Sequence, residues 1–513
     1  MGRNHRIRNY GLAGLALVST FVVAIFVGCR TDFGGLGATG DFLATGRTGS
    51  SFTAIQVDPR SEDSAGPQFV VAEDINGDGF TDLVSAWNQS QPVQIHFQKR
   101  SSLGAIRFET VTLAGNVPVV GVAGLGVTDF DRDGRMDIAV LAKETLEAGA
   151  ACLDSELPQT QGLSGVVLLY LGPDDRTQTD EPLAWTEIPV EDSRLQGKAG
   201  AAGSPPEAGG FTAMRTGDID RDGDMDILVA WNSDCGGSTP VSDVVFFSNN
   251  GAAAVRDGSW TGSRIPNGAP IGTTIKDVAV GDIDEDGDLD IIATFPDAGS
   301  LNLRWFRNPQ IDIPDDYHIS NGQWQTGPVG QIATGADCIR IGDIDRDGHL
   351  DVVVRSSAGK LIQWLKGPGV QSTTQPLPNL PWQVYTLAEF TQRTPSALAL
   401  ADLNFDGQLE VIASADGAVE WFNSQQAPTV YDQWIENLII DDEPEANPGS
   451  TPPTTDPNVT PTEVAGGTKI NALLPVDLDG DGAIDLIATL DRSGLSGISN
   501  DALVWFRNTR IAP

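Results

Sequence analysis

Acidic side chains alternate through a short motif that occurs seven times in the sequence. In the clearest copy Asp282, Asp284 and Asp286 take positions one, three and five, Gly287 follows, and Asp290 closes the motif at position nine. Carboxylates packed this densely repel one another unless a cation holds them together. Oxygen ligands at these positions, with the backbone carbonyl of position seven, suit a hard cation, calcium before magnesium. We expect Gly287 to adopt positive φ, so that the loop turns and position nine returns to the ion.

The seven copies supply the candidate metal ligands at positions one, three, five and nine. They are Asp74, Asn76, Asp78 and Asp82; Asp129, Asp131, Asp133 and Asp137; Asp218, Asp220, Asp222 and Asp226; Asp282, Asp284, Asp286 and Asp290; Asp343, Asp345, Asp347 and Asp351; Asp402, Asn404, Asp406 and Glu410; and Asp477, Asp479, Asp481 and Asp485. We therefore expect up to seven calcium ions. The copy at Asp402 is expected to bind least well, because Asn404 replaces an aspartate and Glu410 is one methylene longer.

These motifs dominate the charge of the chain. The sequence has 32 basic and 70 acidic residues, which gives a net charge of −38. A chain this acidic cannot hold nucleic acid through phosphate contacts, so that class of partner is excluded.

The residues after each motif predict a strand and not a helix. A short apolar run follows position nine at once, as in Ile291–Thr294. An EF-hand needs a glutamate at position twelve, but that position in this copy is Ala293. An apolar run of four or five residues between turn residues is typical of a buried strand. The motif is therefore a turn between two strands, and the EF-hand is rejected.

Each repeat contains four strand-like pieces, and the third often carries an aromatic pair such as Trp305 and Phe306. We interpret these recurring aromatic residues as packing between the units. Four-stranded units repeated seven times predict an all-β fold, a seven-bladed β-propeller of four-stranded antiparallel blades, over residues 51–510. The last repeat lacks a fourth strand after Asn508, and the alternating segment Phe52–Val57 is expected to complete it.

The pattern Asp-x-[Asp/Asn]-x-Asp-Gly-x-x-[Asp/Glu] resembles the FG-GAP and VCBS-type repeats of integrin α-subunit propellers and of many secreted bacterial proteins. The resemblance covers roughly residues 52–508, and the VCBS-like variant fits better because literal Phe-Gly and Gly-Ala-Pro elements are mostly absent. It implies that the loops bind calcium and that the propeller presents a recognition surface. Some relatives are lectins or polysaccharide lyases, so the family alone does not decide the function.

The N-terminal segment is predicted to be a signal. Arg3, Arg6 and Arg8 precede a mostly apolar run that ends at Gly28, so we expect a signal peptide over residues 1–28 and a flexible tether over 29–50. The residues before Cys29 resemble a bacterial lipobox, which implies lipidation of that cysteine and a place at the cell envelope. Ordinary cleavage with secretion, or an uncleaved anchor, are the alternatives. Contact with a membrane is expected only through this lipid or anchor.

Three further cysteines are compatible with export. Cys152 and Cys235 lie in strand two-to-three connectors of adjacent blades, where a disulfide could join them if the Cα atoms come within about 7 Å. Cys338 lies in a first strand and is predicted to be a buried free thiol.

The connectors opposite the metal loops vary in length, which commonly marks the binding face of a repeat fold. A Pro- and Thr-rich stretch at 441–468 is expected to be a disordered insertion. Trp87, Trp231 and Phe295 each stand five residues after the closing aspartate of their loop, at the edge of this face. They are candidates for a ligand patch that stacks on sugars or anchors a protein. The alternative is that they cover apolar surface beneath the long loops.

Two functions follow from these features. The first is a non-enzymatic, calcium-binding recognition propeller at the envelope with a protein or glycan partner. The second is a carbohydrate-active enzyme, most plausibly a polysaccharide lyase, on the same scaffold. A lyase needs a base and a cationic sub-site for uronate, and the variable connectors offer few cations, namely Lys143, Arg194 and Lys198. No nucleophile, phosphate-loop or zinc motif occurs, so we name no catalytic residue.

Overall fold

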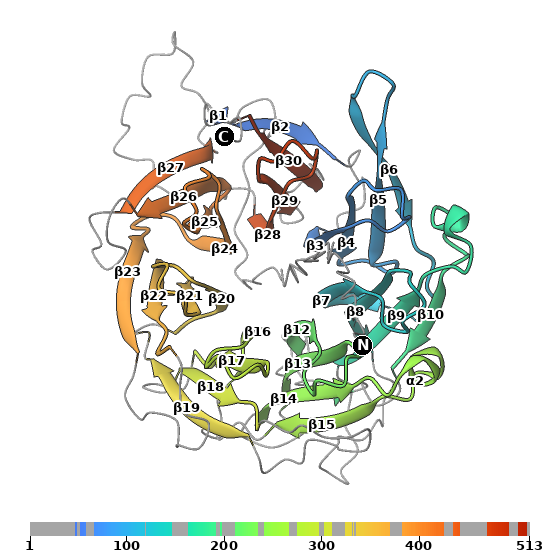
Figure 1. The fold of residues 1–513 in the computed structure, drawn as a ribbon, viewed down its shortest axis with the longest axis horizontal. Coiled ribbons are helices and arrows are strands. Elements are labelled where there is room, and N and C mark those ends of the chain that lie inside the picture. The colour runs from blue at the N-terminus through green and yellow to red at the C-terminus, as the bar shows by residue number, and fades with distance from the viewer. Residues whose placement is uncertain are drawn as a thin grey trace, which may run out of the picture.

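Seven antiparallel sheets are arranged in a ring around a central axis in the computed structural model (Figure 1). The structure describes residues 47–48, 52–57, 66–117, 119–145, 163–190, 195–196, 211–233, 241–265, 274–296, 302–309, 324–330, 332, 335–369, 382–424, 434–441, 469–491 and 501–509. The predicted all-β, seven-bladed propeller is therefore confirmed.

The blades are numbered in chain order, and blades 1 to 5 each have four consecutive strands from the axis outward. Blades 1 to 3 consist of β3 (Pro67–Glu73), β4 (Asp82–Trp87), β5 (Val93–Arg100) and β6 (Ile106–Thr112); β7 (Val119–Thr128), β8 (Asp137–Thr145), β9 (Leu163–Leu171) and β10 (Thr186–Pro189); and β12 (Phe211–Gly217), β13 (Asp226–Ser233), β14 (Val241–Ser248) and β15 (Thr261–Ile265). Blades 4 and 5 consist of β16 (Val278–Gly281), β17 (Asp290–Thr294), β18 (Leu303–Arg307) and β19 (Gln325–Gly330); and β20 (Cys338–Gly342), β21 (Asp351–Ser356), β22 (Leu361–Lys366) and β23 (Gln383–Glu389).

The last two blades also take strands from the start of the described chain. Blade 6 is β24 (Pro395–Ala401), β25 (Glu410–Ala415), β26 (Ala418–Ser424) and β27 (Trp434–Asp441), with β1 (Arg47–Thr48) paired to β27; blade 7 is β28 (Lys469–Val476), β29 (Asp485–Asp491) and β30 (Ala502–Asn508), with β2 (Phe52–Gln56) paired to β30. Smaller elements are β11 (Leu195–Gln196), the 3₁₀ helix η1 (Arg176–Gln178) and the helix α2 (Ala252–Asp257).

Strand β2 closes the ring as the sequence predicts. It pairs antiparallel with β30, with Ile55 opposite Trp505 and Phe52 opposite Asn508. A strand near the start of the described chain thus shares one sheet with the last strand, and this pairing covers the outer edge of β30.

The apolar core lies between blades and not in one central mass. Seven clusters of buried side chains each combine residues from two neighbouring blades. In β18 of blade 4, Trp305 packs in the interface with blade 5, and Phe306 packs in the interface with blade 3. Successive side chains of a strand point to opposite faces, so one aromatic pair fills two interfaces. The predicted packing role of these aromatic residues is confirmed.

Cys338 corrects one prediction, because it is disulfide-bonded and not a free thiol. The other three cysteines, including Cys152 and Cys235, lie outside the described residues. So do the predicted signal, Cys29, most of the tether, and the 441–468 insertion apart from Asp441. Within the described ranges, no helix is both long enough and apolar enough to cross a membrane.

Phe52 provides a test of ring closure. Its side chain is buried between blades 6 and 7, while the neighbouring Thr53 is exposed. Phe52→Ala should lower the free energy of unfolding by about 3 kcal/mol, and Thr53→Ala by less than about 0.5 kcal/mol. Urea unfolding followed by tryptophan fluorescence measures both. Equal, small effects would contradict closure by β2.

Candidate metal loops

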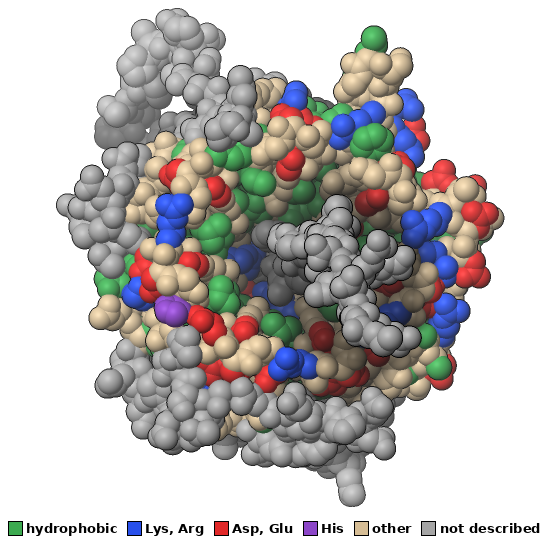
Figure 2. Space-filling view, viewed as in Figure 1, with side chains coloured by type: hydrophobic (Ala, Val, Ile, Leu, Met, Phe, Trp, Pro, Cys, Tyr) green, Lys and Arg blue, Asp and Glu red, His purple; other side chains and the backbone are tan. Residues whose placement is uncertain are grey.

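The seven acidic loops connect the first and second strands of the seven blades. Each blade has the same strand order from the axis outward, so the seven loops share one face of the ring. Figure 2 shows acidic side chains distributed around the central hollow. The seven acidic loops, which are separated in the sequence, therefore form a circular array in the folded chain.

Backbone amides fold each loop around its own carboxylates. In all seven loops the position-six amide donates to the position-one carboxylate at 2.8–3.1 Å. The position-seven amide likewise donates to the position-five carboxylate at 2.8–3.0 Å. These bonds orient positions one and five toward the interior of the loop.

Two residues of every loop have positive φ. Gly287 has a φ of 92°, as predicted, and the glycines at position six of the other loops adopt the same conformation. Position four also has positive φ, although in five loops it is not glycine, as at Arg221 with 59° and Phe405 with 62°. Sequence reasoning missed this feature. Gly77 and Gly480 at position four of two loops are the signal that could have revealed it.

The closing residue at position nine anchors the loop to the blade. One of its carboxylate oxygens accepts from the position-two amide in all seven loops, at 2.7–3.3 Å. In six loops the other oxygen accepts from a backbone amide near the end of the third strand of the blade. One example is the amide of Asn308, which donates to Asp290 at 2.7 Å. Glu410 instead accepts from the side chain of Asn404 at 2.7 Å. The closing carboxylate therefore has a structural role in addition to the predicted ligand role.

Burial raises the pKa of the closing carboxyls. The pKa rises to about 7 for Asp82 and Asp137 and to about 8 for Asp290. The main cause in each case is loss of water, and the neighbouring carboxylates of the loop add to it. The hydrogen bonds from backbone amides act in the opposite direction. A bound cation would favour the ionised form of these groups.

The arrangement of oxygens fits a hard cation. The Oδ1 atoms of Asp131, Asp284 and Asp345, all at position three, are buried without a hydrogen-bond partner among the described residues. In blades 2 and 3 the carboxylates of positions one, three and nine lie within 4.8 Å of one another, and in blade 4 those of positions one, three and five do. The side-chain donors are oxygens only, which suits calcium. Positions one, three, five and nine would hold the ion.

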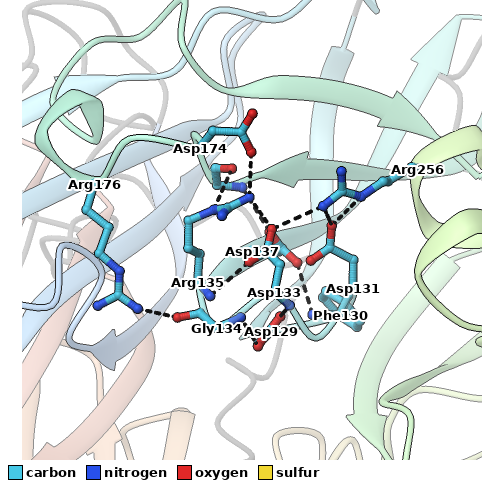
Figure 3. Close-up of polar contacts among 11 residues, drawn as sticks. Asp129, Phe130, Asp131, Asp133, Gly134, Arg135, Asp137, Asp174, Arg176 and Arg256 are labelled. Atoms are coloured by element: carbon cyan, nitrogen blue, oxygen red, sulfur yellow. Dashed lines mark hydrogen bonds and ion pairs between the residues drawn. The ribbon is translucent and has the colours of Figure 1, made fainter.

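Basic side chains lie at the edge of several loops, and blade 2 shows how (Figure 3). Arg256 of helix α2 approaches Asp131 with its Nη2 atom 2.7 Å from Oδ2, and Asp133 at 3.3 Å. Arg135 contacts Asp133 and also Asp174, the latter at 2.9 Å. These contacts engage the outer oxygens of positions three and five, and they leave Oδ1 of Asp131 to an ion.

The three aromatic residues proposed as a ligand patch are buried. Trp87, Trp231 and Phe295 are 0%, 2% and 0% exposed. Trp231 packs between blades 2 and 3, and Phe295 between blades 3 and 4. The indole of Trp87 donates to Ser85 Oγ at 2.7 Å. Their faces are covered, so the ligand-patch interpretation is wrong and the packing alternative is correct.

A buried serine–histidine contact in blade 1 has no access to a substrate. His96 Nε2 lies 2.8 Å from Ser85 Oγ, and Nδ1 lies 2.9 Å from Thr110 Oγ1. His96 and Ser85 are both 0% exposed. Burial lowers the pKa of His96 to about 3, so the ring is neutral. This group is a satisfied polar cluster of the core.

Two parts of the sequence match a known repeat family, which agrees with this geometry. Residues 37–140 and 343–413 match the model of the FG-GAP-like repeat. The chain is a propeller that contains FG-GAP-like repeats. None of the curated proteins matches it significantly.

Several solved structures are similar to this FG-GAP-like propeller at low identity. An Agrocybe aegerita lectin specific for non-reducing terminal N-acetylglucosamine is 13% identical, with a TM-score of 0.41, over 73% of this chain and 80% of that one. BBS1N, solved in complex with ARL6DN, is 14% identical, with a TM-score of 0.45, over 90% and 98%. The Bacillus licheniformis rhamnogalacturonan lyase PL11 is 14% identical, with a TM-score of 0.43, over 90% and 76%. Similarity at this level carries no functional argument.

The raised pKa values predict how stability depends on pH without calcium. The folded pKa of Asp82 and of Asp290 is about 7 and about 8, above the ordinary 3.8. Protonation therefore stabilises the ion-free fold fully below about pH 4, and this contribution is lost as pH rises through those values. In excess EGTA the melting temperature should fall between roughly pH 5.5 and pH 8.5. With calcium the fall should be smaller, because the ion binds the ionised carboxylates. Scanning fluorimetry in parallel buffers measures this, and a rise in EGTA over that range would contradict it.

Proposed function

We propose that this propeller is a calcium-stabilised recognition module of the cell envelope that binds a protein or glycan partner. The observation that carries the proposal is the array of oxygen-only loops on one face. In three of them a buried position-three Oδ1 atom has no hydrogen-bond partner within the described part of the chain. Ions in these loops would neutralise part of the net charge of −38. The basic and apolar N-terminal segment of the sequence supports export.

The opposite face supports the recognition role. There the second and third strands of each blade are connected. In blade 6 this connection is only Asp416 and Gly417, and in blade 5 it is Ser357–Lys360, whereas residues 146–162 separate β8 from β9 in blade 2. A rigid ring with variable connectors on one face is the usual way in which repeat proteins present a binding surface.

Calcium removal tests the metal part of the proposal. Ions that bind only the folded state stabilise it by mass action, so excess EGTA should lower the melting temperature at pH 7.5. Affinities should lie in the extracellular range of about 0.1–1 mM. Elemental analysis of protein dialysed against calcium should detect several calcium ions per chain. An unchanged melting curve, together with calcium-free protein, would overturn this part.

The partner class is tested on the folded, calcium-loaded chain. Binding is measured on a glycan array and by cross-linking in envelope preparations, each in calcium and in EGTA. The same measurements are made on a variant in which residues 146–162 are replaced by Asp-Gly, the connector of blade 6. We expect calcium-dependent binding that the connector variant weakens while its melting temperature is kept. An assay for unsaturated uronate runs beside them. Release of unsaturated product would overturn the recognition role in favour of the lyase.

A further inference from the structure

One position of the third strand supplies a basic side chain to the metal loop in three of the blades. In blade 4, Phe306 of β18 pairs with Ile291 of β17, so the next residue, Arg307, lies beside the closing Asp290. The register is the same in blades 5 and 7, where the corresponding residues are Lys366 and Arg507. The strand ladder thus delivers a basic side chain to the metal loop in three blades.

These basic side chains pair with the carboxylate of position three. Arg307 Nε lies 2.7 Å from Asp284 Oδ2, and both side chains are buried. Lys366 contacts Asp345, and Arg507 contacts Asp479, in the same way. In blade 2 the ladder position is Leu171, and Arg256 of α2 pairs with position three instead. Four loops therefore combine a position-three aspartate with a basic partner.

The two loops with asparagine at position three have no such partner. Blade 1 has Asn76 with Phe97 at the ladder position, and blade 6 has Asn404 with Asn423. Among the described residues, no basic side chain forms an ion pair with the carboxylates of positions one, three or five of these loops. In six of the seven loops, position three is thus either a neutral asparagine or an aspartate paired with a basic side chain.

Blade 3 is the exception. Its position three is Asp220, and the ladder position after Phe247 is Ser248, whose hydroxyl donates to Asp220 Oδ2 at 3.0 Å. Arg132 pairs with Asp224 at position seven of this loop, and among the described residues no basic side chain forms an ion pair with Asp220. The blade 3 loop therefore retains one more negative charge toward an ion than any other loop.

We propose that the loop of blade 3 is the one tight calcium site of this propeller and that the other six are weaker sites. The inference rests on the proposed calcium binding and names which loop dominates it. Calcium affinity follows the charge of the ligand set. One extra unit charge a few ångströms from a divalent ion, at the dielectric of a protein surface, corresponds to about a tenfold difference in affinity or more.

Matched substitutions at the ladder position test the proposal. Ser248→Lys places in blade 3 the residue that blade 5 has naturally. Asn423→Lys adds the same side chain at the same position of blade 6. Lys366→Ser gives blade 5 the arrangement of blade 3. Lys366 is partly exposed, so this change leaves the core intact. Calcium binding to the full chain is measured by equilibrium dialysis with radioactive calcium, and melting temperature in EGTA is measured beside it.

The wild type should show one site that binds at least about tenfold more tightly than the rest. Ser248→Lys should abolish the tight step, Asn423→Lys should leave it, and Lys366→Ser should produce a second tight site. Ser248→Lys should not lower the melting temperature in EGTA, because the lysine neutralises the empty loop. A wild type without any calcium would overturn the proposed function itself. Several sites of one affinity, unchanged by Ser248→Lys, would overturn this inference alone.

Discussion

The contact on which the rest of the structure depends is the buried carboxylate at position nine of each loop. In six of the seven loops it accepts one hydrogen bond from the loop and one from the end of the third strand, as Asp485 does from Leu478 and Asn508. Burying a carboxylate is costly unless hydrogen bonds or a cation compensate for the lost water. Two backbone donors supply part of this compensation, and the raised pKa of about 7 for Asp485 shows that the carboxylate remains destabilised without an ion. The group that maintains the blade geometry is thus also one that a bound cation would stabilise.

The loops also contact one another around the ring. Position four of one loop reaches position seven of the next: Arg132 pairs with Asp224 at 2.6 Å, Arg221 with Asp288 at 2.9 Å, and Glu285 with His349. Positive φ at position four is what directs these side chains sideways. An αL conformation costs a non-glycine residue about 1 kcal/mol, and an exposed ion pair returns at most a similar amount. The contacts therefore fix the relative position of neighbouring loops more than they add stability.

Local patterns in the sequence were sufficient to predict the fold and the position of the acidic loops, whereas features that depend on non-local contacts were not predicted. The seven copies of the acidic motif and the incomplete last repeat predict seven blades and closure by Phe52–Val57, because each depends on residues close in sequence. The burial of Trp87, Trp231 and Phe295 depends on how neighbouring blades pack, and no spacing rule records it. The disulfide state of Cys338 is equally non-local. The hydrogen bonds of the closing carboxylate could not be predicted, because their donors are backbone amides and every residue type except proline has one.

Arginines near the axis show that the acidity of the chain is organised and not uniform. Arg215 of β12 and Arg340 of β20 both reach Asp277, at 2.8 Å and 3.7 Å, and so connect blades 3, 4 and 5. Asp277 also accepts from the amide of Ile339 at 3.0 Å. Buried ion pairs of this kind favour a specific arrangement more than they add stability. Several described basic residues of a chain with a net charge of −38 thus lie where blades meet or beside the acidic loops. The described part of the acidic loops still contains more carboxylates than its basic side chains pair with, and a divalent cation would satisfy that remaining charge.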